Sequence, residues 1–93
     1  MNRDLVKTAN IFKAFSVPIR LEILDLLKNG EECACVLLEA LHLTQSGLSY
    51  HMKILVESGI VTARQDGKWV YYTISEQGRQ KIIQMFLEST ARN

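Results

Sequence analysis

The sequence lacks several features that define common classes of protein. No apolar run approaches the ~18 residues that a membrane-spanning helix needs, and the polar start Met-Asn-Arg-Asp lacks the apolar block of a signal peptide. We therefore expect a cytoplasmic chain that makes no membrane contact. No glycine-rich phosphate loop or nucleophile elbow is present, so we expect no enzymatic activity. Repeats, linkers and low-complexity stretches are also missing, which predicts that residues 1–93 form a single domain.

Net charge and cysteine are both scarce. The formal net charge is only +1, so composition gives no argument for a nucleic-acid partner, and any such prediction depends on where the charges lie. The chain has two cysteines, Cys33 and Cys35, separated by one residue. A disulfide across so short a loop would be strained, and the reducing cytosol disfavours it. We therefore expect free thiols or thiolate ligands.

The sequence does contain a succession of amphipathic helix patterns with recognisable ends. Helical spacing of apolar residues predicts helices over about 3–15, 18–28, 34–41, 45–58 and 76–89. Ser16 is expected to cap the second helix, Thr44 or Ser46 the fourth, and Ser75 the last. Asn29-Gly30 and Gly59 are expected to end the second and fourth helices.

Residues 60–74 change from helical spacing to strict alternation, which predicts a β-hairpin. With Asp66-Gly67 as a two-residue turn, Arg64 lies opposite Trp69, and the two side chains can stack on the outer face. The residues expected to face the core are Val61, Ala63, Val70, Tyr72 and Ile74, whereas Tyr71 points outward. The chain is therefore predicted to be mostly α (α+β), a winged helix-turn-helix of about five helices with one hairpin wing.

The stretch 44–58 carries two different faces. The face expected to be buried consists of Leu48, Met52, Leu55 and Val56, and the opposite face of Ser46, Ser49, Tyr50 and Lys53. Short hydroxyls beside a cation suit base edges and phosphates in the major groove of DNA. The predicted contacts to double-stranded DNA are Gln45, Ser46, Ser49, Tyr50, His51 and Lys53, with Arg64 and Lys68 of the hairpin at phosphates. The alternatives are an ordinary solvated helix and a winged-helix module that binds protein instead of DNA.

Both terminal helices are more apolar than a small monomer requires. Apolar residues spread around most of the girth of 3–15 and of 76–89. This pattern predicts a homodimer that joins through the terminal helices. It would read a palindromic operator with the helix over about 45–58 of each chain as the recognition helix. The alternative is that both helices bury these residues within their own chain.

Cys33 and Cys35 form a candidate site for a thiophilic ion. Two thiolates at i and i+2 can chelate one soft ion, but on an intact helix they point about 200° apart. Ligand binding is therefore expected to deform the start of the third helix and so strain the DNA-reading unit. The alternatives are buried core cysteines and a redox pair that senses oxidation.

Several of these stretches together resemble the ArsR/SmtB family of metalloregulatory repressors, in its arsenic-responsive branch. They are Phe-Ser-Val-Pro-Ile-Arg-Leu-Glu-Ile-Leu at 15–24, Glu-Glu-Cys-Ala-Cys-Val-Leu-Leu at 31–38, Thr-Gln-Ser-Gly-Leu-Ser-Tyr-His-Met-Lys at 44–53 and Gly-Lys-Trp-Val-Tyr-Tyr at 67–72. The resemblance implies a homodimer with no required cofactor that leaves its operator when As(III) or Sb(III) binds Cys33 and Cys35.

The sequence departs from the family pattern next to the cysteines. Val36 stands where arsenite sensors have aspartate, and Leu38 where some members have a third cysteine. The third position on a trivalent arsenic is then left to solvent, a small thiol or an organic substituent, so methylated or aryl arsenicals are alternatives to arsenite. Zinc-sensing members bind zinc through a set of His and acid ligands on the last helix, and residues 76–89 offer no such set, which disfavours zinc.

Overall fold

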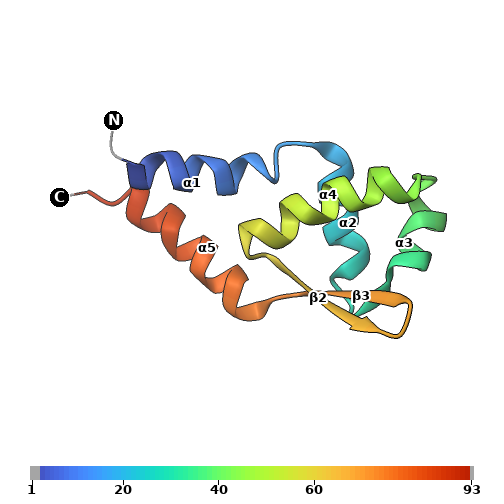
Figure 1. Cartoon of the computed structure of the whole chain (residues 1–93). Helices are drawn as coiled ribbons and strands as arrows, with labels where there is room; N and C mark the ends of the chain where they lie inside the picture. The colour runs from blue at the N-terminus through green and yellow to red at the C-terminus, as the bar shows by residue number, and fades with distance from the viewer. Residues whose placement is uncertain (1–2, 93) are drawn as a thin grey trace.

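The computed structural model describes residues 3–92 and arranges them as helices around a small sheet (Figure 1). In chain order the elements are α1 (Arg3–Lys13), α2 (Pro18–Leu27), β1 (Glu32–Cys33), α3 (Ala34–Leu41), α4 (Gln45–Ser58), β2 (Val61–Asp66), β3 (Trp69–Ile74) and α5 (Glu76–Ser89). The predicted winged helix-turn-helix is confirmed: α3 and α4 form the helix-turn-helix, and β2 and β3 form the wing. No helix within residues 3–92 has the length and apolar character needed to cross a bilayer.

Most helix ends follow from local chemistry, as the sequence predicts. Thr44 Oγ1 accepts a hydrogen bond from the Gly47 amide at 3.0 Å, and Ser75 Oγ accepts one from the Gly78 amide at 2.9 Å. Gly59 ends α4 with a left-handed φ of 91°.

The boundary between α1 and α2 differs from the prediction. Helix α1 ends at Lys13, because Ala14 and Phe15 already lie in a turn. Ser16 does not cap α2: its hydroxyl turns back and donates to the Lys13 carbonyl at 2.7 Å. Val17 is the N-cap residue instead and makes no side-chain cap, so Pro18 at the first helical position is what favours the start of α2.

The core lies where α2, α3 and α4 meet the start of β2. Its buried side chains are Ile23, Leu27, Leu37, Leu48, Met52, Leu55, Ile60 and Val61. The inward face predicted for α4 is confirmed for three of its four residues, whereas Val56 remains 37% exposed. Helix α4 is therefore held by apolar packing from Leu48 to Leu55, and its opposite face is left open.

The wing has a different register from the predicted one. Asp66 pairs with Trp69 and Arg64 with Tyr71, so the two-residue loop is Gly67-Lys68. Gly67 has a φ of 63° at the first loop position, which is the place of glycine in a type II′ turn. The shift is by two residues, so each side chain keeps its predicted face. Ala63, however, is exposed, because the wing extends beyond the core.

A third strand, which the sequence pattern did not predict, joins the wing to the segment before α3. The sheet order is β1-β3-β2, with Glu32 opposite Tyr72 and Cys33 opposite Tyr71. The wing is therefore held along β3 by its pairing with β1 and is not a free hairpin.

Helices α1 and α5 lie together at one end of the molecule, and α3 and the wing turn lie at the other (Figure 1). The Phe12 and Phe86 rings meet edge to face with centroids 5.7 Å apart, and the molecule measures 48 × 22 × 21 Å. Helix α5 begins against the end of α4: a Cβ at Gly78 would overlap the carbonyl oxygen of Gly59. Several apolar side chains of the terminal helices are exposed, namely Leu5, Val6, Ile83, Phe86 and Leu87.

Candidate functional site

The face of α4 opposite the core presents most of the predicted DNA contacts together. The side chains of Gln45, Ser46, Ser49, Tyr50 and Lys53 are all exposed, and Tyr50 is exposed to 62%. Lys53 makes no ion pair with any side chain that the structure describes. The exposed face of α4 therefore offers hydroxyls, an amide and an uncompensated cation on one surface.

His51 is placed differently from its neighbours on α4. Its ring is half-buried, and Nδ1 lies 3.2 Å from the guanidinium of Arg20, whose Nε donates to the Ala14 carbonyl at 2.7 Å. Arg20 is only 6% exposed. Because a guanidinium can only donate, Nδ1 accepts and the ring proton lies on Nε2. Burial, together with the charge of Arg20, lowers the pKa of His51.

The wing has two cations, of which Arg64 pairs with acidic side chains of the described residues and Lys68 does not. Lys68 Nζ lies 5.3 Å from the ring centroid of Trp69 and makes no ion pair with the described side chains. Arg64 donates to both carboxylate oxygens of Glu31, at 2.9 and 3.1 Å. Its guanidinium lies 4.6 Å from the ring centroid of Tyr71, so the predicted stacking of Arg64 on Trp69 is wrong because of the register shift.

Glu31 holds Arg64 through charge and hydrogen bonds, and Thr73 supports it. Thr73 Oγ1 donates to Glu31 Oε2 at 3.4 Å, and Asp66 Oδ2 lies 3.7 Å from Arg64. The hydrogen bonds from Arg64 lower the pKa of Glu31, and the same contact raises the pKa of Arg64. Both side chains are solvent-exposed, so the pair is ionised at neutral pH but screened by water.

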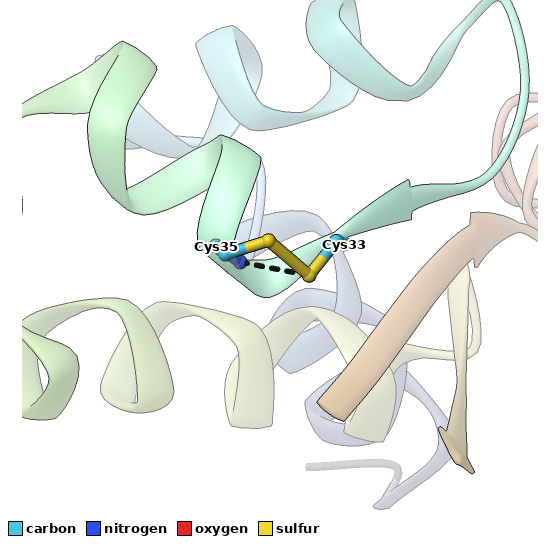
Figure 2. The surroundings of a disulfide bond; sticks show 2 residues. All are labelled: Cys33 and Cys35. Carbon is cyan, nitrogen blue, oxygen red and sulfur yellow. Dashed lines mark hydrogen bonds between the residues drawn. A yellow bond between two sulfur atoms is a disulfide. The ribbon is translucent and has the colours of Figure 1, made fainter. Parts of the chain in front are cut away.

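The two cysteines lie at the junction of β1 and α3, where the structure joins them as a disulfide (Figure 2). This pairing differs from the expectation of free thiols. Cys33 is the N-cap residue of α3 with extended backbone (φ −67°, ψ 143°), and its sulfur accepts a hydrogen bond from the Cys35 amide at 3.2 Å. The expectation that α3 must deform is therefore wrong: because Cys33 precedes the helix, the two sulfurs already meet while α3 stays intact.

A hollow of about 220 Å³ connects the start of α3, at Cys35, with the exposed face of α4 and the wing. Cys35 lines it together with Gln45, Ser49, Lys68 and Trp69. Within residues 3–92, no group of three or more His, Cys, Asp or Glu side chains is arranged to hold a metal ion. The cysteine pair could therefore supply two ligands, with the remaining position on an ion open toward this hollow.

Sequence reasoning missed two residues of this region, Glu31 and Arg20. Glu31 is separated from Arg64 by 33 positions, and Arg20 from His51 by 31. No local spacing signals either contact, because both depend on how distant elements pack. The one available signal for Arg20 is its helical spacing, because it lies three residues before Ile23 and seven before Leu27, on the apolar face of the helix.

Comparison with known proteins identifies the family. The model for "Bacterial regulatory protein, arsR family" matches residues 17–63. An uncharacterized HTH-type transcriptional regulator of Methanocaldococcus jannaschii is 44% identical over 85% of this chain and 90% of that protein. The arsenical resistance operon repressor of Staphylococcus aureus is 47% identical over 82% of this chain and 73% of that protein.

A solved structure supports the same assignment for the fold. The homodimeric winged helix-turn-helix DNA-binding domain of a possible ArsR-family transcriptional regulator from Mycobacterium bovis is 28% identical. It superposes with a TM-score of 0.74 and covers 95% of this chain and 84% of that domain. The chain therefore belongs to the ArsR family of bacterial transcriptional regulators.

Proposed function

We propose that this ArsR-family regulator is a homodimeric repressor that binds a palindromic DNA operator and releases it when trivalent arsenic or antimony binds Cys33 and Cys35. The observation that best supports the proposal is the hollow that Cys35 shares with Gln45, Ser49 and Lys68. It brings a thiophilic site into contact with the surface that we assign to DNA. The relatives named as arsenical resistance operon repressors support the choice of ligand.

In this proposal α4 enters the major groove and the wing lies over the DNA backbone. The exposed hydroxyls of Ser46, Ser49 and Tyr50, with the Gln45 amide, contact base edges and nearby phosphates. Lys53 and Lys68 neutralise phosphates, because neither cation is compensated by a described side chain. His51 takes part only through Nε2, since Arg20 occupies Nδ1. Arg64 reaches a phosphate only after it leaves Glu31.

Dimerisation is assigned to α1 and α5. Their exposed apolar side chains include Leu5, Ile83 and Leu87, with exposed fractions of 55%, 45% and 55%. A cluster of this kind is typical of an interface between copies of a small chain, because burial removes apolar surface from water. The homodimeric Mycobacterium bovis domain supports this assignment.

The proposed reaction consumes the reduced cysteine pair. Arsenous acid exchanges two of its hydroxyl groups for the two sulfurs, so that two As–S bonds form and two water molecules leave, with one hydroxyl remaining on arsenic. The oxidation state of arsenic does not change. Because the two sulfurs already lie side by side at the start of α3, chelation requires no unwinding of the helix. The adduct then lies beside Gln45 and Ser49 and disturbs their contact with DNA.

The test is fluorescence anisotropy of the reduced protein on a labelled duplex from its own upstream region, titrated with arsenite. Wild type is expected to release the duplex at low arsenite, whereas Cys33→Ser and Cys35→Ser stay bound. If wild type binds DNA but ignores arsenite, the ligand assignment is wrong. If no duplex is bound with salt-dependent affinity, the DNA assignment is wrong and a protein-interaction module is favoured.

A second candidate input is oxidation, which the pairing of Cys33 with Cys35 favours. An oxidant of the peroxide class would convert the dithiol to the disulfide, with the loss of two hydrogens from the peptide that contains both cysteines. Anisotropy with reduced and mildly oxidised protein, checked by mass spectrometry of that peptide, separates the two inputs. Equal DNA affinity of the two forms would exclude the redox alternative.

A further inference from the structure

We propose that Glu31 is a positioning residue that withholds Arg64 from DNA and couples the cysteine pair to the wing. The proposal rests on the proposed function, because it adds a route through the sheet to the direct one through the hollow, by which a change at the cysteines reaches the DNA-binding surface. It assigns Arg64, a cation of the wing, to internal positioning in the DNA-binding form. Lys68 is then the wing cation that meets phosphate.

The first step is that Arg64 already has hydrogen-bond and charge partners within the protein. Its guanidinium makes two hydrogen bonds to Glu31, lies 3.7 Å from Asp66 and faces the ring of Tyr71. Guanidinium and carboxylate are both planar forks, so the two parallel bonds also define the orientation of the Arg64 side chain. A cation neutralised in this way displaces few counterions from a phosphate and contributes little to the salt dependence of DNA binding.

The second step is that this pair is connected to the cysteines through the sheet. Cys33 lies opposite Tyr71 in the β1–β3 pairing, and Tyr71 lies opposite Arg64 in the β2–β3 pairing. Residues directly opposite each other in an antiparallel sheet point to the same face. Cys33, Tyr71 and Arg64 therefore form one row across the three strands. Glu31, which immediately precedes β1, closes this row by binding Arg64.

The third step is that a change at Cys33 reaches the wing through this row. Cys33 is both the last residue of β1 and the N-cap of α3, so a ligand that draws its sulfur toward the hollow also pulls on β1. Glu31 then moves with β1 and carries Arg64, and with it β2, to a new position. Loss of the Glu31 carboxylate should therefore free Arg64 and weaken the coupling between the cysteines and β2, while the pairing of β1 with β3 remains.

The first experiment needs no arsenical. The affinity of the reduced protein for the operator duplex is measured by anisotropy across a salt series for Glu31→Gln, for the matched control Glu32→Gln, and for Arg64→Gln in both backgrounds. Glu32 makes no ion pair with any described side chain, so its substitution removes the same charge one residue away. In wild type, Arg64→Gln should leave the log–log slope unchanged. In Glu31→Gln, Arg64→Gln should flatten the slope by up to about 0.9, the contribution of one phosphate contact.

The second experiment measures the coupling itself, as the ratio of operator Kd with and without arsenite. Glu31→Gln should reduce this ratio several-fold, whereas Glu32→Gln should keep the wild-type ratio. A flattened slope for Arg64→Gln in the wild-type background, or a wild-type ratio in Glu31→Gln, overturns the proposal. If wild type shows no response to arsenite, the proposed ligand and the coupling role both fail, and the salt series still decides whether Glu31 withholds Arg64. The side chains of Glu31 and Arg64 are both exposed, so their substitution should leave the protein folded. A thermal melt of each variant checks this.

Discussion

Replacing Gly78 with alanine should destabilise the protein, although alanine is the better helix former. Gly78 lies in the first turn of α5, and a Cβ there would overlap the carbonyl oxygen of Gly59 and lie 3.2 Å from Ser75 Oγ. Helix propensity favours alanine by up to about 1 kcal/mol. Against this, an overlap with backbone, which cannot rotate away as a side chain can, costs about 1–3 kcal/mol. With the full propensity gain subtracted, the expected net loss in the free energy of unfolding is up to about 2 kcal/mol.

The assay is urea unfolding of Gly78→Ala and wild type at one fixed protein concentration, because a dimer makes stability depend on concentration. Gln77→Ala is the matched control, since Gln77 is exposed in the same turn of α5. Its stability should equal or slightly exceed that of wild type. If Gly78→Ala is as stable as the control, the close approach between α5 and the end of α4 does not exist. The reasoning about how α5 is seated would then be wrong.

Three further predictions concern α4 and the terminal helices. Lys53→Ala should weaken binding to all duplexes and flatten the salt slope by about 0.9, whereas Ser49→Ala should mainly change sequence preference. Equal losses from Ser49→Ala on operator and random DNA would contradict its role. Because the pKa of His51 is lowered in the folded protein, the imidazole takes up a proton at higher pH in the unfolded chain than in the folded one. Stability against urea should therefore fall as the pH drops below 6.5. The fall should be smaller in His51→Gln. An identical pH profile in the variant would refute this. Leu87→Glu should give a monomer in light scattering, whereas Leu21→Glu, equally exposed on α2, should not. A dimeric Leu87→Glu protein would exclude this face.

The helices could be predicted from sequence because their signals are local. The spacing of Leu48, Met52 and Leu55 marks the buried face of α4, and the hydroxyls of Thr44 and Ser75 cap the amides three residues on. Ser16 shows where a local signal is ambiguous. A hydroxyl between two helices can cap the one that follows or bond back to the one that precedes it, and here it bonds to the Lys13 carbonyl.

The sequence predicts the β-hairpin of the wing correctly but gives its strands the wrong register. An Asp-Gly pair favours a turn with both residues in the loop, but a type II′ turn places only its first residue at positive φ, and Gly67 occupies that position. Since side chains alternate with a period of two, a shift of two residues preserved the faces of Val70 and Tyr72. Cross-strand partners do not survive such a shift. Arg64 therefore faces Tyr71 and not Trp69.

Whether the two cysteine sulfurs can meet depends on whether Cys33 has helical or extended backbone. The sequence predicts that residues two apart on a helix diverge, which is correct for helical backbone. The predicted helix, 34–41, has the same bounds as α3, so Cys33 lies outside it as the last extended residue, and its sulfur meets that of Cys35. The local pattern did not reveal that Cys33 pairs with Tyr71 of β3, a contact between distant parts of the chain that keeps Cys33 in extended backbone.

Because the molecule is elongated, a small rotation at one end moves the other end by a larger distance. In a dimer joined through α1 and α5, each subunit extends from the junction along its 48 Å axis, with the start of α4 toward the far end (Figure 1). A rotation of about 5° at the junction moves the far end by about 4 Å. This displacement is large for two recognition helices that must both fit half-sites about 34 Å apart. Small changes in how the terminal helices meet therefore suffice to take both recognition helices out of phase with the DNA.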